Sequence, residues 1–210
     1  TGVQTCALPI FQNKRVRADG LFYLYLSKLI YLNQNKTKLT KSKLVDDAGY
    51  FIEKNKTNFS NIRLNNFYFD LAKSHFYRGE YKKAFSILNE MYQNYYSKDY
   101  TTDFNLHARF LFCFICFELG EKELLKSTAL SIADFMKRNR IVFKFEKKMI
   151  RFIRYDLTDF QNKSFEVRQK KLKSLKSEIT TIFESKYERK VLNYFDYFYW
   201  IDSLSTRFNK

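Results

Sequence analysis

The sequence predicts an all-α fold with a sizeable core, and three observations support this prediction. The 210 residues include a single Pro and 5 Gly, which is too few for the turns of hairpin-rich or Greek-key folds. Hydrophobic residues make up 45% of the chain, and a chain of this length can bury roughly 70% of its unfolded surface. From about residue 18, apolar residues recur every three or four positions, which is the helical period. We therefore expect about eight helices.

Residues 1–10 differ abruptly in composition from the rest of the chain. They include Cys6 and Pro9 and carry no charge, whereas the residues after Phe11 are rich in Lys, Asn and Phe. The peptide resembles the translation of a sequencing adapter, and the chain does not begin with Met. We interpret residues 1–10 as a non-native segment fused to a truncated gene, and a native N-terminal strand or arm is the alternative.

The remaining chain is expected to form one continuous unit in three segments. Residues 11–60 would contribute N-terminal helices of a truncated array, residues 61–138 two helical hairpins, and residues 139–210 basic C-terminal helices. Polar clusters predict the breaks between helices, at positions 33–43, 97–103 and 161–164.

Two apolar stripes separated by a Gly predict the first hairpin. The first stripe contains Leu64, Phe67, Tyr68, Leu71, Ala72 and His75. The second contains Tyr81, Ala84, Phe85, Leu88, Met91, Tyr92 and Tyr95. Gly79 lies between them, where a tight turn between helices favours a residue with a left-handed backbone.

The same order of features predicts a second hairpin. An apolar helix over residues 104–119 is followed by Gly120 and by a return stripe at Leu124, Leu125, Thr128, Ile132, Phe135 and Met136. Two hairpins with matched turns indicate a repeat. Further helical faces are expected at Phe145, Met149 and Phe152, at Leu172, Leu175, Ile179 and Ile182, and at Val191, Phe195, Phe198 and Asp202.

The first hairpin resembles the core of a tetratricopeptide repeat. The matching positions are Leu71, Ala72, Gly79, Tyr81, Ala84 and Leu88, and in the second hairpin Gly120 corresponds to Gly79. The resemblance implies that Ala72 and Ala84 let the two helices approach and that Tyr81 packs under the turn. His75, Met91 and Tyr96 depart from the family's preferred residues. Gly120 also follows Gly79 by 41 residues, against a usual period of about 34.

The resemblance implies a fold of antiparallel helical hairpins stacked as an α-solenoid. Proteins of this architecture bind a protein or peptide on the surface formed by successive repeats. We therefore expect a non-enzymatic scaffold for protein–protein interaction. No sequence feature indicates an oligomeric state.

Cys113 and Cys116 form a C-x-x-C pattern, but their context predicts no chemistry. They lie in the middle of an apolar helical stretch, without the preceding strand of a redox motif or the second ligand pair of a zinc site. We interpret both as small buried hydrophobic residues. The three cysteines suggest no disulfide framework, so we expect a reducing, cytoplasmic location.

The two histidines are not expected to be catalytic or metal-binding. His75 falls on an apolar face, where a hydrogen-bonded core residue is the more common case, and no suitable nucleophile lies nearby in the sequence. His107 lies near a helix start and is expected at the surface. A metal site shared by the two histidines is the alternative, but no carboxylate spacing supports it.

The acidic pairs and glycines also predict no active site. Asp46 with Asp47, and Asp156 with Asp159, are expected at solvated helix ends. The glycines are scattered singly, which excludes a phosphate-binding glycine loop. We therefore expect no enzymatic activity, no cofactor and no bound metal.

The net charge of +16 is concentrated outside the hairpins. Residues 61–136 hold 9 basic and 9 acidic residues, whereas residues 137–190 hold 17 basic and 7 acidic residues. The candidate basic surface consists of Arg168, Lys170, Lys171, Lys173 and Lys176. A solvated helix face explains these residues, and a surface that binds the phosphate backbone of nucleic acid is the alternative function. The apolar runs are too short to span a membrane.

Overall fold

The computed structural model describes residues 14–39, 42–95 and 101–207. These residues contain no strand, which confirms the all-α prediction, and they form eleven α-helices rather than about eight. Two of the eleven, α2 (Lys36–Leu39) and α10 (Lys186–Arg189), have only four residues, and single turns of this length are too short to produce a visible period in the sequence. Two of the predictions concern residues 1–10 and Tyr96, which lie outside the described residues.

The chain divides into two compact units, Thr1–Asp99 and Tyr100–Lys210. The division falls within the segment 61–138, so the two predicted hairpins belong to different units. None of the described helices combines the length and the apolar character needed to cross a bilayer.

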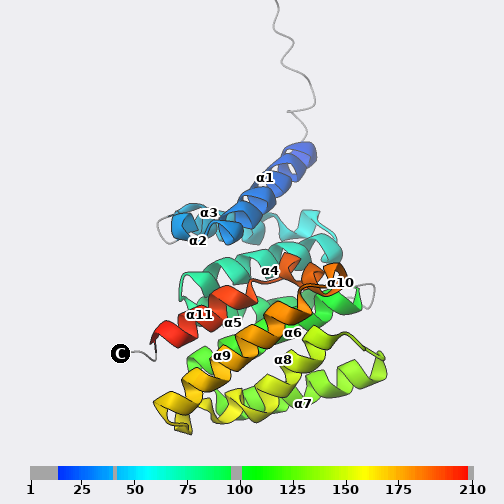
Figure 1. The fold of residues 1–210 in the computed structure, drawn as a ribbon. Helices are drawn as coiled ribbons and strands as arrows, with labels where there is room; N and C mark the ends of the chain where they lie inside the picture. The colour runs from blue at the N-terminus through cyan, green and yellow to red at the C-terminus, as the bar shows by residue number, and fades with distance from the viewer. Residues whose placement is uncertain (1–13, 40–41, 96–100, 208–210) are drawn as a thin grey trace, which may run out of the picture. The chain divides into compact units, whose positions relative to one another are not determined.

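Unit 1 is built around one central helix. Its elements are α1 (Lys14–Gln34), α2 (Lys36–Leu39), α3 (Leu44–Asn55), a 3₁₀ turn (Lys56–Asn58), α4 (Asn61–Tyr77), α5 (Tyr81–Glu90) and a π-helical segment (Met91–Tyr95). Helix α4 packs against α1, α3 and α5 (Figure 1). Its apolar residues from Leu64 onward are consequently almost completely buried, whereas Ile62 in its first turn is exposed. The predicted stripe over residues 81–95 is divided at Glu90, where the α-helix becomes π-helical.

The turn between α4 and α5 depends on Gly79. Its φ of +75° is in the left-handed region, which Gly adopts without the steric cost of a Cβ. The Glu80 amide donates to the His75 carbonyl at 2.9 Å, as in a Schellman cap. Ala72 and Ala84 are both fully buried, so the two helices approach closely at these small residues.

Unit 2 is a second set of packed helices. Its elements are α6 (Thr102–Leu119), α7 (Lys122–Arg138), α8 (Lys144–Tyr155), the 3₁₀ segment η4 (Leu157–Asn162), α9 (Phe165–Ile182), α10 (Lys186–Arg189), the 3₁₀ turn η5 (Lys190–Asn193) and α11 (Tyr197–Arg207). Consecutive helices α6, α7, α8 and α9 pack in order, and α11 returns against α9 (Figure 1). Gly120 ends α6 with a φ of +76°, matching Gly79 in unit 1.

Aromatic packing also joins α11 to α6. The rings of Phe114 and Trp200 stack with centroids 3.9 Å apart, and the Trp200 indole donates to Glu118 at 3.0 Å. The predicted helical face from Val191 to Asp202 is wrong in its first half, because α11 begins only at Tyr197. The Asp196 carboxylate accepts a hydrogen bond from the Tyr199 amide at 3.0 Å, as an N-cap residue does, and so favours a helix start at this point.

Candidate functional site

Both cysteines of the C-x-x-C pattern are buried on α6, as expected. Neither thiol is exposed to solvent. Burial raises the pKa of the Cys113 thiol and raises that of Cys116 to about 12. Because the thiolate is the reactive form, both side chains are unreactive near neutral pH.

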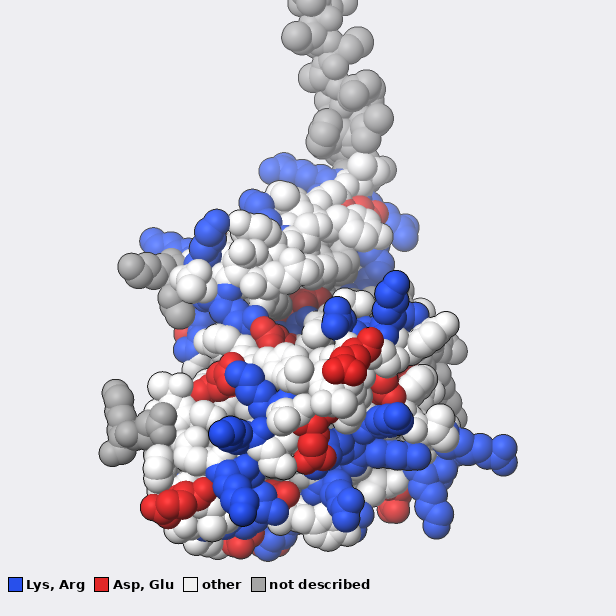
Figure 2. Space-filling view, viewed as in Figure 1, with Lys and Arg blue, Asp and Glu red and all other residues white. Residues whose placement is uncertain are grey.

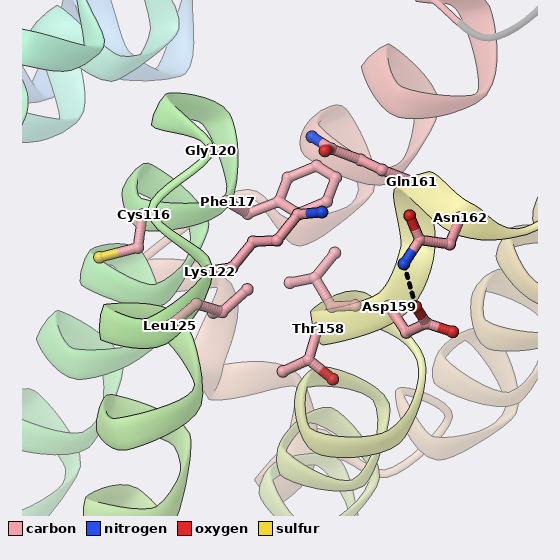
Figure 3. A pocket seen from close by; sticks show the side chains of 10 residues that line it. Cys116, Phe117, Gly120, Lys122, Leu125, Thr158, Asp159, Gln161 and Asn162 are labelled. Atoms are coloured by element: carbon pink, nitrogen blue, oxygen red, sulfur yellow. Dashed lines mark hydrogen bonds between the residues drawn. The ribbon is translucent and has the colours of Figure 1, made fainter.

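The cavity beside Cys116 is too small to hold a substrate. It has a volume of about 10 Å³ and lies between the α6–α7 turn and η4 (Figure 3). Asn162 donates to Asp159 at its edge, and the Cys116 sulfur points away from this pair. A space of this size holds roughly one water molecule.

The pairs of acidic residues do not form reactive clusters. Asp46 pairs with Arg78 at 3.1 Å in unit 1. Asp156 pairs with Lys163 at 3.2 Å and with Lys171 at 3.1 Å in unit 2. These carboxylates stabilise local structure by pairing with neighbouring cations. Among the described residues, no group of three or more His, Cys, Asp or Glu side chains has an arrangement that could hold a metal ion.

His75 is a buried residue of the α4–α5 turn, as the sequence predicts. It is 5% exposed, and its Nδ1 lies 2.5 Å from Glu80 Oε2. Glu80 also pairs with Arg78 at 2.9 Å. Burial lowers the pKa of His75, and the nearby Glu80 carboxylate partly opposes this effect. His75 therefore helps to hold the end of α4 against the start of α5.

His107 is buried, so the prediction of a surface position is wrong. It is 1% exposed, although it lies in the second turn of α6. The Tyr194 ring stacks on the imidazole with centroids 4.6 Å apart, and the rings of Phe145 and Tyr197 lie within about 6 Å of it. The prediction failed because the residues that cover His107 come from distant parts of the sequence.

Burial holds His107 in the neutral form. Its Nδ1 lies 2.6 Å from the Tyr197 hydroxyl, and its Nε2 lies 3.7 Å from Glu146 Oε1. Burial lowers the pKa of His107 to about 3. The imidazole is therefore uncharged at neutral pH despite the nearby carboxyl group.

Glu146 is the most unusual acidic residue of unit 2. It is 3% exposed, and its Oε2 atom has no hydrogen-bond partner among the described residues. Burial raises the pKa of Glu146, a backbone hydrogen bond partly opposes this effect, and the carboxylates of Glu188 and Asp103 add to it, so that the pKa is about 7. Buried groups with pKa values displaced toward neutrality are typical of binding and catalytic sites.

His107 and Glu146 line a pocket of about 150 Å³. The residues around it come from the helices α6, α8 and α10, from the 3₁₀ turn η5 and from the adjoining segments: Asp103, His107, Phe143, Glu146, Tyr187, Glu188, Lys190, Val191 and Tyr194. The Glu188 carboxylate accepts hydrogen bonds from the Lys144 and Phe145 amides at 2.8 and 3.1 Å, so it caps α8. We refer to this space as the Glu146 pocket.

Glu146 was not among the predicted site residues, although the sequence contains a local signal for it. Glu146 shares one face of α8 with the buried residues Met149, Ile150 and Ile153, at spacings of three, four and seven. An acidic residue within such a stripe must be buried with the stripe. The other members of the pocket carry no comparable signal.

The candidate basic surface on α9 is only partly free. Lys171 pairs with Asp156 at 3.1 Å, and Lys176 pairs with Asp202 at 2.6 Å. Lys170 and Lys173 are exposed, and Arg168 is half-buried. The opposite, inward face of α9 consists of Leu172, Leu175 and Ile179, which are almost fully buried.

A groove along α8 and α9 gathers a second set of basic residues, which the sequence analysis did not single out. The groove has a volume of about 350 Å³ and is lined by Lys147, Lys148, Ile150, Arg151, Arg154, Tyr155 and Glu178. Figure 2 shows Lys and Arg side chains over the face on which α8 and α9 lie, with carboxylates between them. The signal was the helical spacing of the basic residues from position 144 to position 154.

No protein-family model, no curated protein and no solved structure matches the chain.

Proposed function

We propose that the protein is a non-enzymatic binding protein whose unit 2 binds the phosphate backbone of nucleic acid in the groove between α8 and α9. The observation that carries this proposal is the excess of cations in the groove, where four basic side chains meet a single carboxylate, that of Glu178. Lys and Arg side chains in one groove bind nucleic acid by releasing the counterions of its phosphates.

The single carboxylate leaves most of the positive charge available. Glu178 pairs with Lys148 at 2.5 Å, and this hydrogen bond lowers the pKa of Glu178. The positive charge of Arg151 lowers that pKa further. Lys147 and Arg151 are exposed and form no ion pair with a described residue. The surrounding residues 137–190 hold 17 basic and 7 acidic residues, which would steer a polyanion toward the groove.

Two observations favour binding over catalysis in the Glu146 pocket. With a pKa of about 3, His107 would be a weak base at neutral pH. No Ser, Thr or Cys side chain is among the described residues that line the pocket, so it offers no such nucleophile.

The two buried thiols favour a reducing compartment, so we propose a cytoplasmic location.

A second candidate function is protein binding by a tetratricopeptide-like helical repeat. Helix α1 of unit 1 exposes large apolar side chains along one face, and their exposed fractions lie between 41% and 58%: Val16, Tyr23, Leu24, Ile30 and Tyr31. An exposed apolar stripe of this kind is typical of a surface that binds another protein. The closely packed α4–α5 hairpin supports the likeness to the repeat family.

A salt titration of nucleic-acid binding tests the first proposal. We expect fluorescence anisotropy with labelled single- and double-stranded oligonucleotides to give a steep negative slope of log affinity against log salt concentration. The double variant Lys147→Ala/Arg151→Ala should reduce that slope by about 2 and weaken binding at low salt roughly tenfold. The matched control Lys28→Ala/Lys82→Ala removes two exposed charges from unit 1 and should change neither quantity.

The outcome separates the two candidate functions. A slope near zero, or equal slopes for the two double variants, would contradict binding of phosphate in this groove. For the second candidate, the test is capture of a protein partner that survives nuclease treatment. This capture should be lost in Leu24→Glu and retained in the Lys147→Ala/Arg151→Ala variant.

A further inference from the structure

We infer that the Glu146 pocket of unit 2 is a binding site for a small organic cation that carries a primary ammonium group. The site is separate from the basic groove between α8 and α9, and the inference does not depend on nucleic-acid binding. It rests on the charges that line the pocket, on the unpartnered oxygen of Glu146 and on the aromatic walls.

The charges around the pocket favour a cation. Three carboxyl groups line it, those of Asp103, Glu146 and Glu188, whereas Lys190 is the one Lys or Arg among the described residues of its lining. Both Glu188 oxygens already accept hydrogen bonds from backbone amides at the start of α8. Asp103 and Glu146 are therefore the carboxyl groups that remain for a ligand.

Glu146 supplies the specific contact. Its Oε1 atom lies 3.7 Å from His107 Nε2, and its Oε2 atom is buried without a hydrogen-bond partner among the described residues. Buried acceptors without a donor are rare in folded proteins. A ligand that donates hydrogen bonds to this carboxyl group, as an ammonium group does, satisfies the acceptor and also compensates its charge.

The rest of the lining matches the apolar part of such a ligand. Phe143, Tyr187, Val191 and Tyr194 contribute aromatic and aliphatic surface to the pocket. Aromatic faces attract cations, and apolar surface covers a short alkyl chain. The volume of about 150 Å³ limits the ligand to a few non-hydrogen atoms beyond the ammonium group.

Binding should be linked to the ionisation of Glu146. Its pKa of about 7 means that much of this carboxyl group is protonated at neutral pH, whereas an ammonium ligand prefers the carboxylate. Affinity should therefore rise as the pH increases from 6 to 8. The titratable and charged groups that face the site are His107 and Asp103 of α6, Glu188 and Tyr187 of α10, Lys190 of η5, Tyr194, and Tyr197 of α11.

The test uses the full chain with n-propylammonium chloride as the probe. The chain has two His, so a ¹H–¹³C spectrum of the imidazole rings resolves one signal from each unit. We expect the His107 signal to shift saturably with a dissociation constant on the order of millimolar, because so small a ligand makes few contacts. The His75 signal serves as the internal control for salt and should not move. The neutral probe 1-propanol should not shift His107 saturably.

Two variants assign the contact to the carboxyl groups. Glu146→Gln keeps the shape of the side chain but cannot ionise, and it should weaken n-propylammonium binding at least tenfold and abolish its pH dependence. Asp103→Asn changes an exposed residue and should weaken binding about threefold with the fold intact, which keeps the test valid if Glu146→Gln unfolds. Glu184→Gln removes an exposed carboxylate of unit 2 outside the pocket and should bind like the wild type.

Three results would overturn the inference. The first is a His107 signal that does not shift up to 100 mM n-propylammonium, a ceiling roughly a hundredfold above the expected dissociation constant. The second is an equal response to 1-propanol. The third is wild-type affinity in both folded carboxyl variants. Loss of nucleic-acid binding in the groove variants would leave this inference unaffected.

Discussion

The two histidines of this protein are buried to a similar extent, but their surroundings differ in origin and in consequence. His75 in unit 1 is 5% exposed and contacts Glu80, five residues further along the chain. His107 in unit 2 is 1% exposed and contacts Tyr197 and Glu146, which are 90 and 39 residues away. The first pair belongs to a turn between two helices, and the second belongs to a pocket.

The difference shows what distinguishes a structural histidine from one in a candidate site. Glu80 is partly exposed and is paired with Arg78, so the interactions around His75 are satisfied within the turn. Glu146 is almost fully buried, and one of its oxygens has no partner among the described residues. A buried polar group without a partner, whose pKa is displaced by burial, marks a candidate site for binding or catalysis.

The largest expected effect is on the stability of unit 2 and comes from removing the Phe145 ring, which packs near His107. Phe145 is fully buried against Tyr197 and Phe183, so Phe145→Ala should destabilise unit 2 by about 3–5 kcal/mol. Trp200 is the only Trp and lies in unit 2, so its fluorescence during urea unfolding measures this change. The His75 signal in the folded protein should not move. A Trp200 transition that matches the wild type would contradict the assigned packing.

The next effect concerns pH. The folded-state pKa of Glu146, about 7, lies above its ordinary value of 4.5. Its contribution to stability is therefore fully present below pH 4.5 and is lost as the pH rises through 7. The contribution of His107 to stability changes with pH in the opposite direction. Its folded-state pKa of about 3 lies below 6.5, so its contribution is present above pH 6.5 and is lost as the pH falls toward 3.

The variant Glu146→Gln isolates the contribution of this one carboxyl group. Between pH 4.5 and 8, the free energy of unfolding of the wild type should fall by roughly 3 kcal/mol relative to that of Glu146→Gln. The measurement is urea unfolding monitored by Trp200 across this pH range. Parallel curves for the two proteins would show that Glu146 ionises at its ordinary pKa.

A smaller effect compares the hydrogen bonds of the two histidines directly. Tyr197→Phe leaves the buried Nδ1 of His107 without its partner and should destabilise unit 2 by about 1–2 kcal/mol. Glu80→Gln changes a partly exposed partner of His75 and should destabilise unit 1 by less than about 1 kcal/mol. Hydrogen exchange of amides in α6 and α4 measures the two changes separately. Equal effects would remove the distinction between the two sites.

The smallest losses of stability are expected from replacing the glycine of each turn, and they should be nearly equal in the two units. Gly79 and Gly120 both have left-handed backbones, and no atom lies within 4 Å of a Cβ placed at either residue. Each Gly→Ala variant should therefore cost about 1 kcal/mol through backbone strain alone. Thermal unfolding followed by circular dichroism is the measurement. A cost confined to one variant would show that the two turns are not equivalent.

The sequence predicts the helices and the turns better than it predicts the candidate site. Helices and turns depend on residues close together in the sequence, whereas the site depends on residues far apart in it. Helices such as α4 and α7 follow from apolar residues three or four positions apart, and the turn at Gly79 follows from one residue. The burial of His107 depends on Tyr194 and Tyr197, which lie at the far end of unit 2 in the sequence. Only Glu146 marked the pocket locally, by its place within an apolar stripe.

The most direct measurement is a pH titration of both imidazole signals in one sample of the full chain. His75 should titrate with a midpoint below 6.5, because burial lowers its pKa. His107 should remain neutral down to about pH 4, with only a small step near pH 7 as the Glu146 carboxyl 3.7 Å away ionises. Two histidines that both titrate near 6.5, with no step near pH 7, would contradict the buried Glu146 pocket.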